Sequence, residues 1–156
     1  MLLSAEELKN QLRKFNLMGY SDISVKYADN GKNGKVLTLT DELWKYEDEF
    51  YGGEPYSGNE TIWLNGQDVF RCVYWGKVES GIDFGNIYNF LRDALKTGPS
   101  GNCVHRGPQD FSKDNLHYIN ACTGTIEHFT QTEKIFLNNQ LVYTAYFIGG
   151  RINTRK

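Results

Sequence analysis

The chain has 156 residues, of which 40% are hydrophobic and 14% aromatic, so it can form the core of one folded domain and is not a disordered chain. It carries 17 Lys and Arg against 19 Asp and Glu, and a net charge of −2 disfavours direct nucleic-acid binding. No apolar run reaches the roughly 18–20 residues that cross a bilayer, and the acidic pair Glu6 and Glu7 does not fit a secretory signal. We therefore expect a single cytoplasmic domain over residues 1–156 with no membrane partner.

Two segments predict helices. Ser4 and Glu7 form a capping-box pattern at the start of the first. Its apolar stripe is Leu8, Leu12 and Phe15. The second helix begins near Asp83 and ends at Gly98 and Pro99, where glycine can adopt the left-handed cap and proline cannot continue the helix. Its expected apolar face is Phe84, Ile87, Tyr88, Leu91 and Leu95.

Several segments outside the helices have the composition of strands. The predicted strands are residues 23–27, 36–40, 43–51 and 116–122. Residues 29–34, with the sequence DNGKNG, are typical of a hairpin loop. Residues 98–115 form the longest stretch predicted to be irregular.

The chain also contains an internal repeat. Residues 60–76 recur at 133–149, an offset of 73, with seven identities in 17 positions. Chance pairing would give about one identity, so we interpret the match as a duplication. Each copy predicts a β-hairpin, because Asn65-Gly66 and Asn138-Asn139 favour the positive φ angles of a two-residue turn.

A two-residue loop sets an expected register and two expected faces. It places Leu64 opposite Gln67, Ile62 opposite Val69 and Glu60 opposite Arg71. The face expected to be buried holds Trp63, Phe70, Cys72 and Tyr74, with Phe136, Tyr143, Ala145 and Phe147 in the second copy. The other face holds Ile62, Val69, Arg71, Val73 and Trp75, with Ile135, Val142, Tyr146 and Ile148, and is apolar enough to be covered by another element, a second subunit or a ligand.

These elements predict an α+β fold. We expect two αβββ repeats, residues 1–80 and 81–152, whose antiparallel strands are related by a pseudo-twofold axis. Because neither hairpin would be stable alone, the two halves should share one core.

Repeated acidic and aromatic residues form the first candidate site. Glu54 and Tyr56 match Glu127 and Phe129 at the same offset, and a pseudo-twofold axis could bring such pairs to a common cleft. Glu60 and Glu133 form a second pair of this kind. Paired carboxylates can act as general acid and base or hold a cation. The structural alternative is that Glu60 pairs with Arg71 across the hairpin while Glu54 lies in a solvated turn.

A second candidate is Arg106, within His105-Arg106-Gly107-Pro108. Its guanidinium could receive a carboxylate or phosphate, or its stem could pack against the protein. Trp75 belongs to a surplus of aromatic residues suited to ligand pockets or subunit interfaces. The other members of that surplus are Tyr46, Phe50, Tyr51, Tyr56, Tyr88, Tyr118 and Tyr146.

The cysteines indicate no metal site or cofactor. Cys72, Cys103 and Cys122 are odd in number, widely spaced and without a CxxC motif. We expect three reduced thiols, no zinc and no bound cofactor.

Five stretches resemble one protein family. They are residues 50–60 (FYGGEPYSGNE), 73–78 (VYWGKV), 90–95 (FLRDAL), 106–108 (RGP) and 142–150. They resemble a bacterial domain family of unknown function, found alone or C-terminal to an XRE-type helix-turn-helix domain. The similarity covers most of the chain except residues 20–40, where the 29–34 loop looks like a variable insert. The resemblance implies a sensory or dimerising role and no catalytic residues.

We therefore expect a non-catalytic, small-molecule-binding or interaction domain, homodimeric and linked to transcriptional regulation. The expected ligand-binding residues are Glu54, Tyr56, Trp75, Arg106, Glu127 and Phe129. One alternative is a small enzyme that uses paired glutamates in a cleft between the repeats. Another is a phage or mobile-element protein that binds or sponges a host component.

Overall fold

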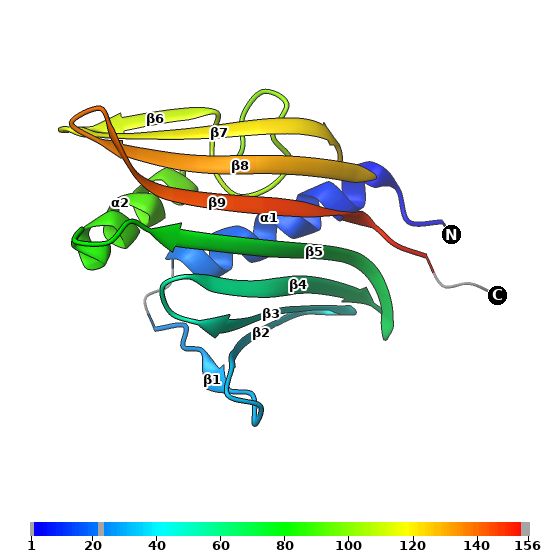
Figure 1. Ribbon diagram of the computed structural model, residues 1–156. Helices are drawn as coiled ribbons and strands as arrows, with labels where there is room; N and C mark the ends of the chain where they lie inside the picture. Colours follow the sequence, from blue (N-terminus) through cyan, green and yellow to red (C-terminus); the bar gives the residue numbers. More distant parts are fainter. Residues whose placement is uncertain (1, 22–23, 154–156) are drawn as a thin grey trace.

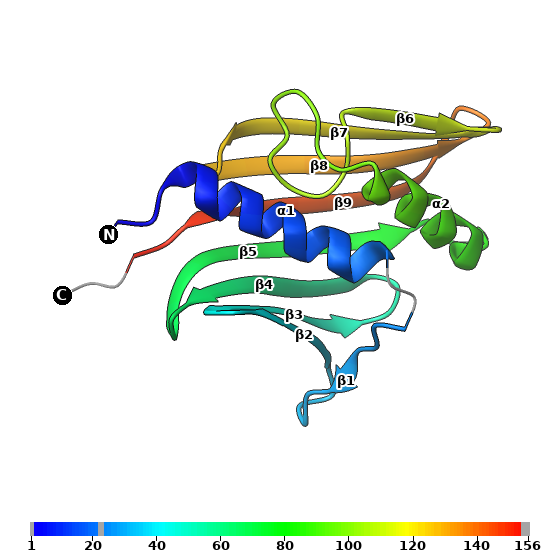
Figure 2. The same cartoon turned by 180° about the vertical axis from the view of Figure 1, so that it is seen from behind.

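Two helices lie against one face of a nine-stranded antiparallel sheet in the described part of the chain (Figures 1 and 2). The structure, a computed structural model, describes residues 2–21 and 24–153. The strand order is β1-β2-β3-β4-β5-β9-β8-β7-β6. The elements are α1 (Ala5–Ser21), β1 (Ala28–Asp29), β2 (Lys35–Asp41), β3 (Trp44–Gly52), β4 (Tyr56–Leu64), β5 (Gln67–Val78), α2 (Phe84–Lys96), β6 (Asp110–Lys113), β7 (Leu116–Thr125), β8 (His128–Leu137) and β9 (Gln140–Arg151). The predicted α+β class and antiparallel sheet are confirmed.

Both helices begin, and α2 ends, where their capping residues predict. The Glu7 amide donates to Ser4 Oγ at 3.1 Å while the Ser4 amide donates to Glu7 Oε2 at 2.9 Å, which is the capping box. Asp83 accepts from the first amides of α2, and Gly98 has a φ of 77° just beyond its end. The predicted stripe of α1 is buried. In α2 the expected face is wrong at one position, because Phe84 is 59% exposed and Phe90 and Ala94 pack into the core instead.

The two repeated hairpins have the predicted turns. Asn65 and Gly66 have φ angles of 50° and 79° between β4 and β5. Asn138 and Asn139 have φ angles of 49° and 65° between β8 and β9. Asparagine tolerates this left-handed region better than most residues, which explains why it can stand where the other turn has glycine.

A β-bulge in each hairpin corrects the predicted register. Leu64 lies opposite Gln67 as expected, but Ile62 lies opposite Phe70 and not Val69. The second hairpin is shifted at the corresponding place, between Ile135 and Phe136. A bulge adds one residue to one strand and so returns the following residues to the other face. Ile62 and Ile135 are therefore buried in the core, contrary to the face predicted for them.

The same bulge overturns the predicted pair of Glu60 with Arg71. Glu60 lies opposite Cys72, and Arg71 lies opposite Thr61. Glu60 is 3% exposed, so its carboxylate is inside the protein and not at a solvated strand edge.

The strand content also differs from the prediction. Ile23 of the predicted 23–27 strand lies outside the described residues, and residues 24–27 are not a strand. The stretch 98–115 contains a short strand, β6. Each helix is thus followed by four strands, β2–β5 or β6–β9, with the two-residue β1 added in the first half. The expected helix-plus-three-strand unit is therefore wrong in its number of strands.

The middle of the sheet is the pair formed by β5 and β9. Tyr74 of β5 lies directly opposite Phe147 of β9, and these residues are 73 positions apart. One continuous core lies between this sheet face and the helices, with contributions from both halves of the chain. In the described residues, neither helix is long and apolar enough to cross a membrane.

Candidate functional site

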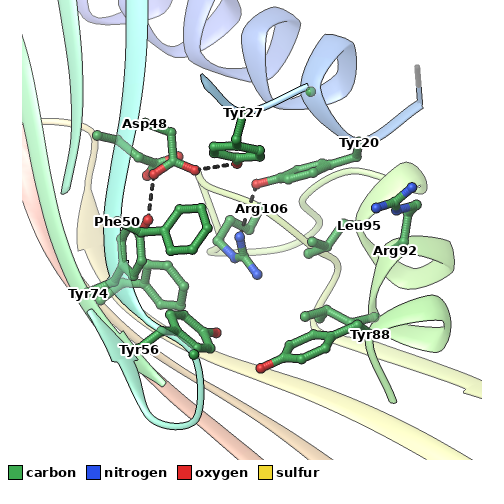
Figure 3. A pocket seen from close by; sticks show the side chains of 15 residues that line it. Tyr20, Tyr27, Asp48, Phe50, Tyr56, Tyr74, Tyr88, Arg92, Leu95 and Arg106 are labelled. Carbon is green, nitrogen blue, oxygen red and sulfur yellow. Dashed lines mark hydrogen bonds between the residues drawn. The ribbon is translucent and has the colours of Figure 1, made fainter. Parts of the chain in front are cut away.

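A cavity of about 350 Å³ lies between the helix-covered face of the sheet, the last turn of α1 and one side of α2 (Figure 3). Its walls are largely aromatic, with the carboxylates of Asp48 and Glu60 and the guanidinium groups of Arg92 and Arg106 among the rings. The rings are Tyr20, Tyr27, Phe50, Tyr56, Tyr74, Tyr88 and Phe147. The volume lies within the range of small-molecule sites.

Strand alternation brings the acidic side chains to this face. Asp48 lies opposite Glu60 on the neighbouring strand, and Glu60 lies opposite Cys72 on the next. Residues opposite one another in an antiparallel pair point to the same face. The two carboxylates of β3 and β4 are therefore neighbours at the wall of the cavity.

Asp48 is held by two tyrosines. The Tyr27 hydroxyl donates to Oδ2 at 2.7 Å, and the Tyr74 hydroxyl donates to Oδ1 at 2.5 Å (Figure 3). Burial and the charge of Glu60 raise the pKa of the Asp48 carboxyl to about 6, although the two tyrosine hydrogen bonds and Arg106 act in the opposite direction. Asp48 is thus an acid that titrates near neutral pH.

Glu60 has a basic partner, the imidazole of His105, in the loop that follows α2. His105 Nε2 lies 2.6 Å from Glu60 Oε2, and both side chains are buried. The Tyr46 hydroxyl donates to Oε1 at 2.5 Å. Burial by itself would raise the pKa of Glu60, but His105 and the tyrosine hydrogen bond lower it below the usual value. Glu60 is therefore ionised and paired.

Glu133 is paired in the same way by the next residue of the loop. Arg106 Nε and Nη2 each lie 2.9 Å from Glu133 Oε1, and the Tyr118 hydroxyl donates to Oε2 at 2.5 Å. Arg106 also donates to the Tyr20 hydroxyl at 3.2 Å. Of the two roles considered for Arg106, the structure shows a carboxylate bound by its guanidinium, and that carboxylate belongs to its own chain.

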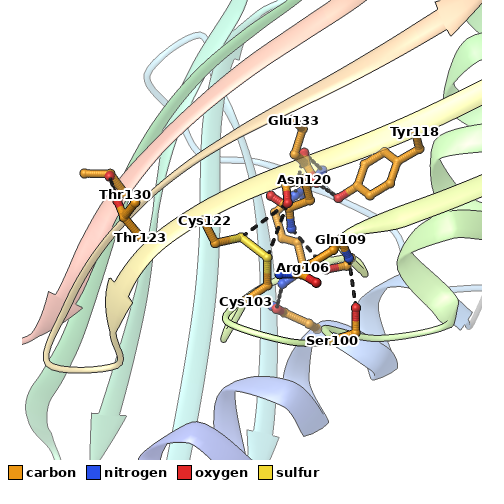
Figure 4. Close-up of a disulfide and its surroundings, with 12 residues drawn as sticks. Ser100, Cys103, Arg106, Gln109, Tyr118, Asn120, Cys122, Thr123, Thr130 and Glu133 are labelled. Carbon is orange, nitrogen blue, oxygen red and sulfur yellow. Dashed lines mark hydrogen bonds and ion pairs between the residues drawn. A yellow bond between two sulfur atoms is a disulfide. The ribbon is translucent and has the colours of Figure 1, made fainter.

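A disulfide anchors the loop that carries His105 and Arg106 (Figure 4). Cys103 in the loop is bonded to Cys122 of β7, and Cys72 is the buried free cysteine. The expectation of three reduced thiols is therefore wrong for two of them. The sequence separation of 19 residues carries no motif, so only the fold reveals the pairing. Asn120 Nδ2 adds a hydrogen bond of 3.0 Å to the Gly107 carbonyl.

Two of the six expected ligand-binding residues, Tyr56 and Arg106, line the cavity. The Tyr56 hydroxyl is 2.8 Å from the hydroxyl of Tyr143 in β9, which joins the two halves of the sheet at this point. Phe50 and Tyr88, named among the surplus aromatic residues, line the same cavity.

The other four expected residues lie elsewhere. Glu54 accepts hydrogen bonds from the Val78 amide and the Tyr88 hydroxyl and lines a separate hollow of about 470 Å³ beside the start of α2. Glu127 forms an ion pair of 3.3 Å with Arg151 at the opposite end of β9. The remaining two are Phe129, buried in the core against Phe70, and Trp75, on the outer face of the sheet.

Sequence reasoning missed Asp48, Tyr27 and Tyr74 as residues of the cavity. Tyr27 comes from a segment with no regular structure, and Asp48 stands in a strand with other acids, where nothing distinguishes it from a surface residue. The alternation of β3 is the one signal that could have located Asp48, because it places this acid on the face of the buried Tyr46.

Glu60, Cys72 and His105 are the group in the described residues that could hold a metal ion, with ligand atoms within 4.8 Å of one another. Burial raises the pKa of the Cys72 thiol, so the sulfur stays protonated in this setting. Glu60 is already bound by His105 and Tyr46. The geometry is that of a buried ion pair beside a neutral thiol.

The fold is an α+β domain with a cavity of about 350 Å³ on the helix-covered face of its sheet. A family model described as "Domain of unknown function (DUF5680)" matches residues 48–152, and the chain belongs to this family. Neither the comparison with curated proteins nor that with solved structures gave a significant match. The matched region includes Asp48, Glu60, Arg106 and Glu133, and therefore most of the polar framework of the cavity.

Asp48→Asn should make the protein more stable at pH 7.5, by roughly 1–3 kcal/mol. The folded pKa of about 6 lies above the usual 3.8, so ionisation of Asp48 lowers stability above pH 6, and this effect disappears as the pH falls toward 4. Urea denaturation at pH 7.5 and at pH 4.5 measures the difference in free energy of unfolding between the variant and the wild-type protein at each pH.

Glu49→Gln is the matched control, because it removes a carboxylate from the adjacent position, on the other face of β3. It should shift the stability by less than about 0.5 kcal/mol at either pH. A loss of stability in Asp48→Asn at pH 7.5 would contradict the account of this site.

Iodoacetamide should label one cysteine per chain in the denatured, unreduced protein and three after reduction, as read by intact mass. Reduction should also lower the free energy of unfolding by about 3 kcal/mol, because it releases a closed loop of this size. The double variant Cys103→Ser/Cys122→Ser should show no further change on reduction. Three labels without reduction would rule out the disulfide.

Proposed function

We propose that this chain is a non-catalytic domain that binds a small organic molecule in the cavity beneath α1 and α2. The observation that carries the proposal is the combination of a volume of about 350 Å³, a nearly continuous aromatic wall and a few polar groups that converge on the space. Binding sites for small molecules typically have this composition, since rings supply contact area and polar groups set orientation.

The state of the glutamates supports binding over catalysis. Glu60 and Glu133 are each in contact with a basic side chain and a tyrosine hydroxyl of the same chain, so their carboxyl oxygens are already engaged within the protein. Glu54 and Glu127, the other pair considered for an enzyme, lie near opposite ends of the central strands.

The proposal includes an origin by duplication, with two halves related by a pseudo-twofold axis. It is supported by equivalent details: Tyr74 opposite Phe147, the same bulge in both hairpins, and a Tyr–Glu hydrogen bond in each half. Those hydrogen bonds join Tyr46 to Glu60 and Tyr118 to Glu133. Its sensor-type role in the bacterial cytoplasm, linked to transcriptional regulation, is supported by the resemblance to domains found beside helix-turn-helix domains.

We also propose a homodimer formed through the outer face of β5 and β9. Trp75 stacks on Tyr146 across these strands at 6.2 Å, and the neighbouring Val73 and Ile148 are 52% and 50% exposed. This apolar patch surrounds the proposed pseudo-twofold axis, and an exposed cluster of large apolar side chains is typical of a protein–protein interface.

The neutral fluorescent probe N-phenyl-1-naphthylamine should bind the protein with one site per chain. Gly19→Leu should weaken this binding at least about tenfold, because residue 19 lines the cavity and a side chain there reduces its volume. A Cβ at this position meets no atom closer than 3.5 Å, so the fold should accept the substitution.

Asn10→Leu is the matched control, because it places the same side chain on an exposed position of α1. It should leave the fluorescence titration unchanged. No binding to the wild-type protein, or equal binding to Gly19→Leu, would contradict the proposed function.

Light scattering should give the mass of two chains for the wild-type protein, and Val73→Lys should reduce it to one, because it places a charge in the apolar patch. Thr38→Lys adds the same charge at an exposed position of β2 and should stay dimeric. A one-chain mass for the wild-type protein at about 100 μM would exclude the dimer.

A further inference from the structure

The carboxylates around the cavity are not equally compensated. Glu60 has the imidazole of His105 and Glu133 has the guanidinium of Arg106 as a basic partner. Asp48 is bound by the neutral hydroxyls of Tyr27 and Tyr74, and within residues 2–21 and 24–153 no basic side chain lies at ion-pair distance from it. One negative charge at the wall of the cavity is therefore left without a counter-ion.

The register makes this charge more unfavourable. Asp48 lies directly opposite Glu60, and two like charges opposite one another on neighbouring strands repel. The partner of Glu60, His105, is completely buried and is not among the residues that line the cavity. A positive charge inside the cavity would relieve the repulsion that the fold itself leaves in place.

The rings around Asp48 are also suited to a cation. Aromatic faces carry partial negative charge and attract ammonium and guanidinium groups within about 6 Å. Arg106 already shows this contact in the same wall, since its guanidinium carbon lies 4.7 Å from the ring centre of Phe147 and 5.6 Å from that of Tyr20. Phe50 and Tyr27 stand edge to face beside Asp48, 5.1 Å apart.

The cavity also lacks a free anion site in its interior. Arg106 is the basic group placed deepest in the wall, and Glu133 already occupies its guanidinium. Arg92, the other basic residue at the cavity, lies on exposed α2 surface, across from Asp48 (Figure 3). A carboxylate or phosphate beside Asp48 would therefore be repelled by Asp48 and Glu60, while the one guanidinium in that part of the wall is already bound to Glu133.

We propose that the ligand of this cavity is a small organic cation, an inference that rests on the proposed function. Its ammonium group would lie against Asp48 among the tyrosine rings, and its apolar part would extend toward Leu91 and Leu95 of α2.

Binding should depend on pH through Asp48. The charged and titratable groups that interact with it are Glu60, Tyr74, Tyr27, Arg106, Tyr20, Tyr46 and Cys72. With the pKa of the free protein at about 6, the carboxylate is mostly ionised at pH 7.5 and mostly protonated at pH 5. The affinity for a permanent cation should therefore fall about tenfold between these two values.

Three ring-matched probes test the charge preference: benzyltrimethylammonium, neutral benzyl alcohol and anionic benzoate, each titrated by NMR at pH 7.5. We expect benzyltrimethylammonium to bind at least about tenfold more tightly than either of the other two. We expect Asp48→Asn to remove this preference, because the variant keeps the shape of the side chain without its charge. Glu49→Gln, which removes a carboxylate from the other face of β3, should keep it.

The outcomes separate the two proposals. If N-phenyl-1-naphthylamine binds in the cavity but benzyltrimethylammonium binds no better than benzoate, the proposed function stands and the cation inference is wrong. If the cation preference persists in Asp48→Asn, or does not weaken at pH 5, the inference is equally overturned. If no probe binds, both proposals fail.

Discussion

An ionised carboxylate inside a protein costs several kcal/mol unless a cation and hydrogen bonds compensate it. Glu60 and Glu133 lie in the core on β4 and β8, with β5 and β9 between them, and each has a tyrosine hydroxyl from the adjacent strand. Their basic partners are consecutive residues, His105 and Arg106. The loop between α2 and β6 must therefore cross the face of the sheet to reach both halves. Arg106 of that loop lines the cavity, and the disulfide between Cys103 and Cys122 joins the loop to β7.

Much of the fold could be predicted, because its signals are local. Helix caps such as Ser4 and Asp83 and turns such as Asn65-Gly66 act through their own backbone, and the structure confirms them. The bulges were not predictable in this way. Nothing in the hairpin sequence indicates that Val69 has no partner residue on β4. This one extra residue in β5 sets the register that buries Ile62 and Glu60. An error of one residue in register therefore became an error about which face is the core.

The candidate site was less accessible to sequence reasoning, because its residues meet only in three dimensions. Tyr56 and Arg106 were identified by residue type, but Asp48 became visible only when Tyr27, Tyr74 and Glu60 were seen around it. The symmetry argument also placed the wrong acids together. Residues 73 positions apart lie close together in the middle of the sheet, as for Tyr74 and Phe147, but far apart toward the ends of the central strands, as for Glu54 and Glu127.

The two outermost strands of the sheet have a consequence of their own. β1 has two residues and β6 has four, whereas the strands inside them have seven to twelve. β1 pairs with two residues of β2 and β6 with four residues of β7, so in the described residues the rest of these two longer strands has no strand partner on its outer side. A neighbouring chain can pair with such an edge, and its length is set by the strands next to the borders and not by the borders themselves.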